Sequence, residues 1–293
     1  MYGQDADLIM LGLVSHEPHF TLLREIVDFG GFHKNKNELK TVKKFTKQSD
    51  FQLLHLSILR EYLELEFSDG IEKDSYDVEA IIDDFVFMTF LVGNDFLPHM
   101  PSLDIGENAF DLLFTTYKEQ RATWGKGEYL TQCGKITDPV RLEKYFSVIG
   151  DAETKIFEER EINEGIYLKK KRRWDKRDGK AEGPTDEEIA EQEDLKQQKY
   201  MDMINELKND ELRNSNIELP TTDEKDFKGR YYFEKLNFKP VDLCSHLALR
   251  QAYMEGLIWC LAYYYRGCIS WGWFYPYHYG RLFNIFYFSI RCQ

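Results

Sequence analysis

The stretch IIDDFVFMTFLVGNDFLPH, residues 81–99, decides how the rest of the chain is organised. Apart from the acidic pair Asp83 and Asp84, its first twelve residues can all belong to a core. A helix that is apolar on nearly every side is a buried helix. Gly93 and Asn94 favour the left-handed backbone that ends many helices, so the stretch predicts a buried helix that stops there.

Asp95 follows this stop directly and stands between two apolar segments, so we expect its carboxylate to be buried. A buried carboxylate needs a cation, a metal or several hydrogen-bond donors as its partner. A capping or salt-bridged aspartate and a metal ligand both fit this pattern. We expect Asp83 and Asp84, which lie inside the helix, to pair with an arginine or to face a cleft.

Composition sets the broad class. A chain of 293 residues forms one large domain or two smaller ones, and 43% hydrophobic residues are enough to build a core. A formal net charge of -13 argues against nucleic-acid binding through bulk charge. It is compatible with an acidic cluster that meets phosphate through a bound metal ion.

The cysteine pattern and the N-terminus bear on the compartment. There are 5 cysteines, none in a CxxC pair, which predicts reduced thiols in an intracellular protein. Met1 is followed by no basic region and no apolar core of a signal peptide. No window reaches about 18 uncharged apolar residues. We therefore expect a soluble intracellular protein without a membrane partner.

Hydrophobic spacing predicts a mostly helical chain. Residues 8–13 are compatible with a strand or a buried helical turn, and the lysine-rich stretch 32–49 predicts an exposed linker. The charge-rich residues 152–216 predict an insertion or a mobile arm. The second predicted helix would turn the apolar residues 51, 54, 58, 62 and 65 inward, and Asp77 would cap the third. The predicted helices cover residues 20–29, 51–67, 78–92, 107–117, 139–149 and 241–266.

Asp5 and Asp7 form the first candidate site. Two carboxylates two residues apart, ahead of an apolar segment, can both reach one cation. Magnesium prefers hard oxygen ligands and often takes one or two carboxylates together with substrate phosphate. A solvated acidic loop explains the same spacing.

The aromatic run from Trp271 to Tyr279 is the second candidate. Core packing explains it, and so do rings that serve as stacking platforms for bases. The basic run Lys169–Arg173 is open to three interpretations: a solvated surface, an RNA-facing patch or a nuclear localisation signal. The histidines 16, 19, 99 and 278 lack metal-ligand spacing, so we expect core or surface positions for them.

Several of these runs resemble the Xrn-type 5′→3′ exoribonucleases. They are GQDADLIMLGL (3–13), SHEPHF (15–20), LSILREYL (56–63), FLVGNDFLPH (90–99) and YYY (263–265) with SWGWFYPYHY (270–279). The resemblance implies a mainly α fold with a small α/β portion. Residues 1–30 would be the rear part of a flap-endonuclease-like (PIN-like) nuclease core. A linker (31–50) and the family's largely helical conserved region (51–293) would follow, with a charged insertion at about 152–229 and an unmatched tail at 280–293.

The resemblance also implies a chemistry. Asp5, Asp7 and Asp95 match aspartates that hold catalytic Mg²⁺ (or Mn²⁺) in the family. Trp271 or Trp273, with Trp271 favoured, matches a tryptophan that stacks on RNA bases. The implied substrate is single-stranded RNA with a 5′-monophosphate, hydrolysed to mononucleotides.

Departures from the family pattern shape what we expect of this chain. The family's first segment, with further acidic pairs and the 5′-phosphate pocket, has no match here, so we expect an inactive fragment. The zinc knuckle of the animal nuclear branch is also absent near residues 31–50. Residues 101–109, 255–257 and 267–268 nevertheless resemble that branch, which favours the nucleus, with the cytoplasm as the alternative.

Two other functions fit parts of the pattern. One is a non-catalytic RNA-binding or scaffold protein in which the aspartates are structural. The other is a flap-type DNA endonuclease. That enzyme would need a basic arch and a helical DNA clamp, for which the sequence gives no sign.

Overall fold

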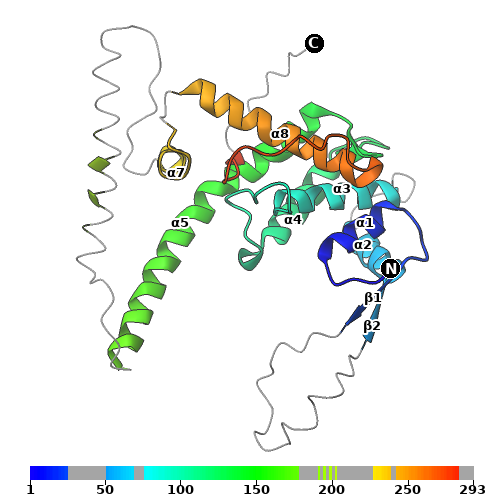
Figure 1. Cartoon of the computed structure of the whole chain (residues 1–293), viewed down its shortest axis with the longest axis horizontal. Coiled ribbons are helices and arrows are strands. Elements are labelled where there is room, and N and C mark those ends of the chain that lie inside the picture. The colour runs from blue at the N-terminus through cyan, green and yellow to red at the C-terminus, as the bar shows by residue number, and fades with distance from the viewer. Residues whose placement is uncertain are drawn as a thin grey trace, which may run out of the picture. The chain divides into compact units, whose positions relative to one another are not determined.

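The computed structural model describes residues 1–25, 51–68, 76–177, 227–238 and 242–283, with a few single positions between 191 and 202. In these residues the fold is mainly helical, with two small antiparallel strand pairs (Figure 1). The chain divides into two compact units. The first holds residues 1–90, 117–139 and 258–271, and the second holds 91–116, 140–257 and 272–293.

The buried helix predicted at residues 78–92 is confirmed as α3, Val78–Leu91. Asp77 caps it as predicted, because its Oδ1 accepts the backbone N–H of Glu79 at 3.0 Å. Seven apolar side chains of α3 are 1% exposed or less, and burial of each contributes about 1.5–3 kcal/mol. They are Ile81, Ile82, Val86, Phe87, Met88, Phe90 and Leu91.

Gly93 ends this run, as the sequence predicted. Its φ of +102° lies in the region that only glycine adopts readily. A Cβ atom here would also lie 2.9 Å from the backbone nitrogen of His99. Glycine is therefore required for the chain to fold back at this point.

A strand pair in the first unit replaces two predicted helical segments. β1 (Thr21–Glu25) pairs antiparallel with β2 (Phe51–His55), so that Thr21 faces His55. The predicted helix 20–29 is thus wrong at residues 21–25, and the predicted helix 51–67 is wrong at its first five residues. Backbone pairing between segments distant in sequence outweighed the local apolar spacing.

The same strand pair bears on the predicted domain division. β1 precedes the proposed linker 31–50 and β2 follows it, yet both belong to one compact unit. This pairing does not test the boundary expected between residues 1–30 and 51–293, which stays a prediction. The linker itself lies outside the described residues.

Helix α1 (Ala6–Val14) settles the question left open for residues 8–13, which are helical. Helix α2 (Leu56–Phe67) buries Leu56, Leu63 and Phe67. The predicted inward residues Ile58, Tyr62 and Leu65 are more than half exposed, so that prediction is wrong. Both stripes have helical spacing, and only tertiary contacts decide which one is buried.

The remaining elements are helical apart from one short hairpin. The first unit contains the hairpin β3 (Thr131–Gln132) and β4 (Lys135–Ile136). The 3₁₀ turn η2 spans Ile105–Glu107 and α4 spans Ala109–Arg121. Then follow α5 (Pro139–Arg177), α7 (Phe227–Leu236) and α8 (Leu243–Arg266), of which α8 agrees closely with the prediction. No helix among the described residues is long and apolar enough to cross a membrane.

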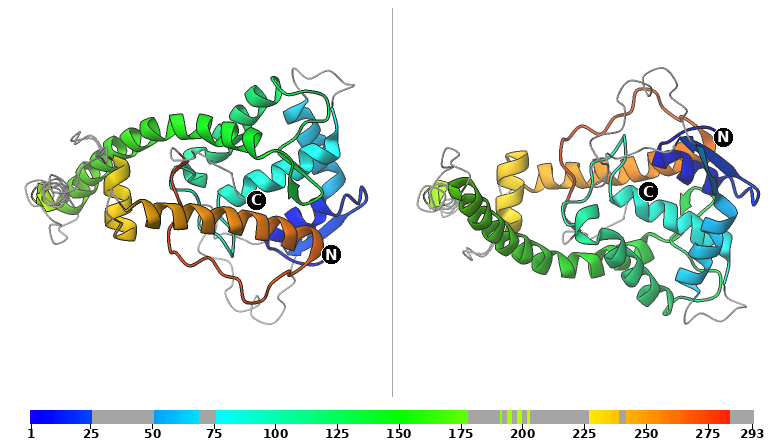
Figure 2. Two further views of the ribbon diagram at one scale, coloured as in Figure 1. Left: turned by 90° about the horizontal axis from the view of Figure 1, so that it is seen from above. Right: turned by 90° about the horizontal axis from the view of Figure 1, so that it is seen from below.

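Helix α5 continues well past its predicted end at residue 149, as Figure 2 shows. The turns of α5 directly after residue 149 belong to the core of the second unit, because Glu153 and Phe157 are buried. Oε1 of Glu153 accepts hydrogen bonds from Ser102 Oγ at 3.0 Å and from the backbone nitrogen of Phe283 at 2.9 Å. Leu282 packs with Phe157, so residues 280–283 belong to this unit rather than to a separate tail.

Candidate functional site

The candidate metal-binding aspartates of the first unit stand at the start of α1. Asp5 is the N-cap residue, with extended backbone, and its side chain makes no capping hydrogen bond. It is exposed, whereas Asp7 in the first helical turn is half-buried. Tyr264 of α8 donates its hydroxyl to Oδ1 of Asp7 at 3.2 Å. Two carboxylates therefore lie close together in sequence at one helix end.

Asp95 is exposed, so the expected burial of this carboxylate is wrong. The reason lies in its neighbour. Oδ1 of Asn94 accepts the backbone N–H groups of Phe96 at 2.9 Å and Leu97 at 2.8 Å, which closes a tight turn. Leu97 turns into the core and Asp95 turns outward, where its carboxylate is accessible to a ligand.

The donor chemistry of these residues fits a partly hydrated magnesium ion. Magnesium typically takes one or two protein carboxylates and completes its octahedron with water and substrate phosphate. Asp5 and Asp7 supply such a pair. No group of three or more His, Cys, Asp or Glu side chains in the described part of the chain is arranged to hold a metal ion.

The two tryptophans of the aromatic run differ in exposure. Trp271 is 93% exposed, an unusual position for so large an apolar ring. Trp273 instead packs over Gly256 of α8, where a Cβ atom would come within 3.1 Å of its ring. Trp271 is therefore the tryptophan that is accessible for stacking on a base.

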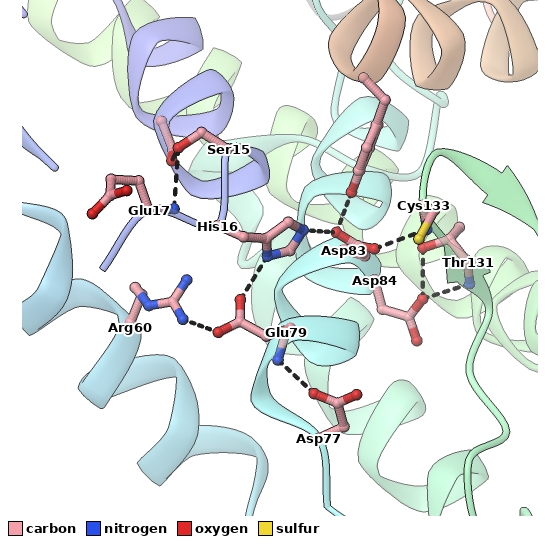
Figure 3. Close-up of polar contacts among 12 residues, drawn as sticks. Ser15, His16, Glu17, Arg60, Asp77, Glu79, Asp83, Asp84, Thr131 and Cys133 are labelled. Carbon is pink, nitrogen blue, oxygen red and sulfur yellow. Dashed lines mark hydrogen bonds and ion pairs between the residues drawn. The ribbon is translucent and has the colours of Figure 1, made fainter. Parts of the chain in front are cut away.

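A polar network centred on His16 joins α1, α2 and α3 (Figure 3). His16 has a left-handed backbone, φ 55°, directly after the end of α1. Its Nδ1 lies 2.6 Å from Oε2 of Glu79, and its Nε2 lies 2.9 Å from Oδ1 of Asp83. Arg60 of α2 donates to the other oxygen of Glu79.

This network shifts the ionisation of its members. The hydrogen bond to Asp83 is the largest cause of a raised pKa of His16, and Glu79 adds to it against the opposing effect of burial. Partial burial pushes the pKa of Glu79 upward, but the hydrogen bonds from Arg60 and His16 lower it overall. These contacts therefore favour the protonated, cationic form of His16, which lies between two carboxylates.

Asp83 and Asp84 have separate sets of donors. Asp83 also accepts the Tyr265 hydroxyl and, at 3.1 Å, the backbone N–H of Cys133. Asp84 is fully buried and accepts four hydrogen bonds, from Tyr117 Oη, Leu130 N and both the nitrogen and the hydroxyl of Thr131. Burial raises the pKa of Asp84 to about 6, although these donors lower it. The expected arginine partner is thus replaced by a histidine for Asp83 and by neutral donors for Asp84.

Sequence reasoning missed most of this network. His16 was expected to be an ordinary core or surface histidine, and the tyrosines were not singled out. One signal was present: Glu79 and Asp83 are four residues apart on a helix, so their side chains share one face. The partners of that face come from distant segments, which spacing alone does not reveal.

Comparison with known proteins decides the family. The profile described as "Xrn1 helical domain" matches residues 75–284, and the profile described as "XRN 5′-3′ exonuclease N-terminus" matches residues 1–26. The first match alone covers well over half of the chain. The chain belongs to the Xrn family of 5′→3′ exoribonucleases. The resemblance seen in the sequence is thereby confirmed, and this Xrn chain is a member of an enzyme family.

Individual relatives agree with the assignment. The Xrn chain is 39% identical over 298 residues to human "5′-3′ exoribonuclease 1" and 33% identical over 366 residues to the Schizosaccharomyces pombe protein of the same name. It is 32% identical over 319 residues to the Drosophila melanogaster "5′-3′ exoribonuclease 2 homolog". These matches cover 94–95% of the chain but only 17%, 26% and 35% of the respective relatives.

Proposed function

We propose that this chain supplies metal-binding and RNA-binding residues of a processive 5′→3′ exoribonuclease. In the whole protein the substrate is single-stranded RNA with a 5′-monophosphate, and the products are mononucleotides. Residues 1–25 would form the rear part of a PIN-like nuclease core. The observation that carries the proposal is the match to both Xrn profiles across the segments that hold Asp5, Asp7 and Asp95.

The metal role is assigned to Asp5, Asp7 and Asp95, with Mg²⁺ or Mn²⁺ as the ion. Support comes from the pair at the start of α1, whose oxygens suit a hard cation, and from the exposure of Asp95. The chemistry that a bound divalent cation supplies at such a site is activation of water and stabilisation of the departing oxygen of the phosphodiester.

Within the chain itself, the aspartates and Trp271 have different tasks. The aspartates would hold the divalent ion. Trp271 would hold a base by stacking, which is tolerant of sequence because every base has a π-face. A binding mode of this kind needs no large basic surface, and it is compatible with the net charge of -13.

The chain alone is proposed to be inactive, since two or three carboxylates leave a pair of magnesium ions short of ligands. A time course with the purified 293 residues, 5′-phosphorylated RNA and Mg²⁺ tests this, and we expect no mononucleotide release. Robust release would refute the proposed inactivity.

A hybrid protein tests whether this chain supports activity in a whole enzyme. In the hybrid, this chain replaces the aligned residues of the human relative. We expect mononucleotide release from 5′-phosphorylated RNA and much less from 5′-hydroxyl RNA or from single-stranded DNA. Preference for DNA would favour the flap-type endonuclease instead.

A non-catalytic RNA-binding or scaffold protein is the second candidate. The observation in its favour is that the described residues include no three-ligand metal cluster. In that case the hybrid would bind RNA without releasing nucleotides, while the native human protein remained active under the same conditions.

The nucleus is the proposed location, with the cytoplasm as the alternative. The support is local: residues 101–109, 255–257 and 267–268 resemble the nuclear branch. Fluorescence microscopy of the tagged protein, with the run Lys169–Arg173 intact or replaced by glutamines, tests the proposal.

A further inference from the structure

Two adjacent tyrosines near the end of α8, Tyr264 and Tyr265, each reach a carboxylate of a different helix. The Tyr264 hydroxyl donates to Oδ1 of Asp7 in α1 at 3.2 Å. The Tyr265 hydroxyl donates to Oδ1 of Asp83 in α3. All of these residues belong to the first compact unit.

The second of these contacts continues back to α1. The same oxygen of Asp83 lies 2.9 Å from Nε2 of His16, the residue that follows the C-cap of α1. The start of α1 is therefore bonded directly to Tyr264, and its end is bonded to Tyr265 through Asp83. This nine-residue helix is held at both ends by neighbouring residues of α8.

We propose that Tyr264 and Tyr265 are positioning residues that set the orientation of α1 and thereby of the metal-binding aspartates Asp5 and Asp7. The inference rests on the proposed metal role of these aspartates. Tyr264 acts directly on Asp7, and Tyr265 acts through the Asp83–His16 link.

The ring of Tyr264 is itself fixed in place. It packs edge-on against Phe90 of α3, with ring centroids 4.8 Å apart at 63°. Phe90 is 1% exposed, so the tyrosine ring packs against a residue of the buried core. A hydroxyl on such a support restricts the directions that the Asp7 carboxylate can take.

The Tyr264–Asp7 distance is long for an O–H···O hydrogen bond. Such contacts in ligand-free sites often tighten when the ligand arrives. A donor in this position would restrict the orientation of a carboxylate that holds an ion. Loss of an outer-shell partner typically lowers metal affinity about 10- to 100-fold.

The test is a Mn²⁺ titration of the full chain, followed by the electron paramagnetic resonance signal of the free ion. We expect Tyr264→Phe, which retains the ring and removes the hydroxyl, to weaken Mn²⁺ binding about 10- to 100-fold. Tyr265→Phe should weaken it by a smaller factor, because its effect is transmitted through Asp83. Tyr263→Phe, the neighbouring tyrosine whose ring stacks on Trp259, is the matched control and should bind like the native chain.

Asp7→Asn separates this inference from the proposed function. If Asp7→Asn weakens binding and both tyrosine variants match the native chain, the positioning role is overturned and the metal role stands. If Asp7→Asn leaves the Mn²⁺ affinity of the chain unchanged, the metal role falls and the inference falls with it.

Two further measurements guard against a trivial loss of folding. Circular dichroism melts show which variants fold, and either tyrosine variant alone carries the test if the other fails to melt cooperatively. In the double variant Asp7→Asn/Tyr264→Phe, the loss of affinity should equal that of Asp7→Asn alone. Additive losses would show that Tyr264 acts independently of Asp7 and would overturn the proposal.

Discussion

Nε2 of His16 lies 2.9 Å from Oδ1 of Asp83, which links the end of α1 to the buried helix α3. Asp83 is only 4% exposed, and such a carboxylate is costly without donors. His16 supplies one donor, and Tyr265 and the backbone of Cys133 supply two more. Asp83, the first of the acidic pair that interrupts the apolar run, is thus a structural junction between α3 and the end of α1.

The His16 junction should make stability depend on pH. Its pKa is raised above 6.5 in the folded protein, so its contribution is complete below pH 6.5 and is lost as the pH rises through the folded value. We expect the native chain to exceed His16→Gln in unfolding free energy at pH 6, with a smaller difference at pH 9. Urea denaturation of both proteins at each pH measures this difference in unfolding free energy.

The control for the His16 prediction is His19→Gln. His19 is exposed, so its substitution should leave the pH profile of stability unchanged. A stability difference for His16→Gln that stays constant from pH 6 to pH 9 would contradict the charged junction.

Asp84 should be essential for folding of the first unit. In Asp84→Asn an NH₂ group replaces one oxygen, which leaves two buried donors without an acceptor. We expect a loss of about 3 kcal/mol in unfolding free energy, measured at pH 7.5, above the folded pKa of about 6. The exposed Asp151→Asn should change stability by less than about 0.5 kcal/mol. A comparable stability for both variants would refute this role.

Trp271 should contribute to RNA binding without contributing to stability. Base stacking on an aromatic ring is worth about 1–3 kcal/mol, so Trp271→Ala should raise the Kd for single-stranded RNA about 5- to 150-fold. Fluorescence anisotropy with a labelled oligonucleotide measures it. Phe274→Ala removes another exposed ring, 73% exposed, and should have a smaller effect. Equal losses for the two variants would leave Trp271 no special role.

Replacement of Gly256 by alanine should force neighbouring side chains to shift. A Cβ atom there would lie 2.5 Å from a methyl group of Leu97 and 3.1 Å from the ring of Trp273. Overpacking of this kind costs about 1–3 kcal/mol, which we expect to see as a lower unfolding free energy of Gly256→Ala. Gly272→Ala meets nothing within 4 Å and is the matched control. If both variants unfold at the same urea concentration, the packing account is wrong.

The sequence predicted those elements whose signal is local. The apolar run 81–92, the cap at Asp77 and the stop at Gly93 were read correctly, because each depends on residues close in sequence. The strand pair β1–β2 was missed, because pairing across 25 intervening residues leaves no local trace. The buried face of α2 was predicted wrongly for the same reason. The helix has two rows of apolar residues with helical spacing, and its tertiary neighbours decide which row is buried.

The candidate site shows the same division. The resemblance located Asp5, Asp7 and Asp95 by their motifs, but the exposure of Asp95 depends on the turn closed by Asn94. Apolar neighbours on both sides suggested burial, although a tight turn can direct one residue outward between two buried ones. The contacts of Tyr264 and Tyr265 could not be predicted from the sequence, because they join α8 to helices that are distant along the chain.

The most direct test is mononucleotide release by the hybrid of this chain with the human relative, with 5′-phosphorylated RNA and Mg²⁺. We expect the hybrid to degrade the RNA and Asp7→Asn or Asp95→Asn to slow it about 100-fold or more. Asp151→Asn should have no effect. An Asp95→Asn hybrid that releases mononucleotides at the undiminished rate would contradict the central claim that this exposed aspartate serves metal-dependent hydrolysis of RNA.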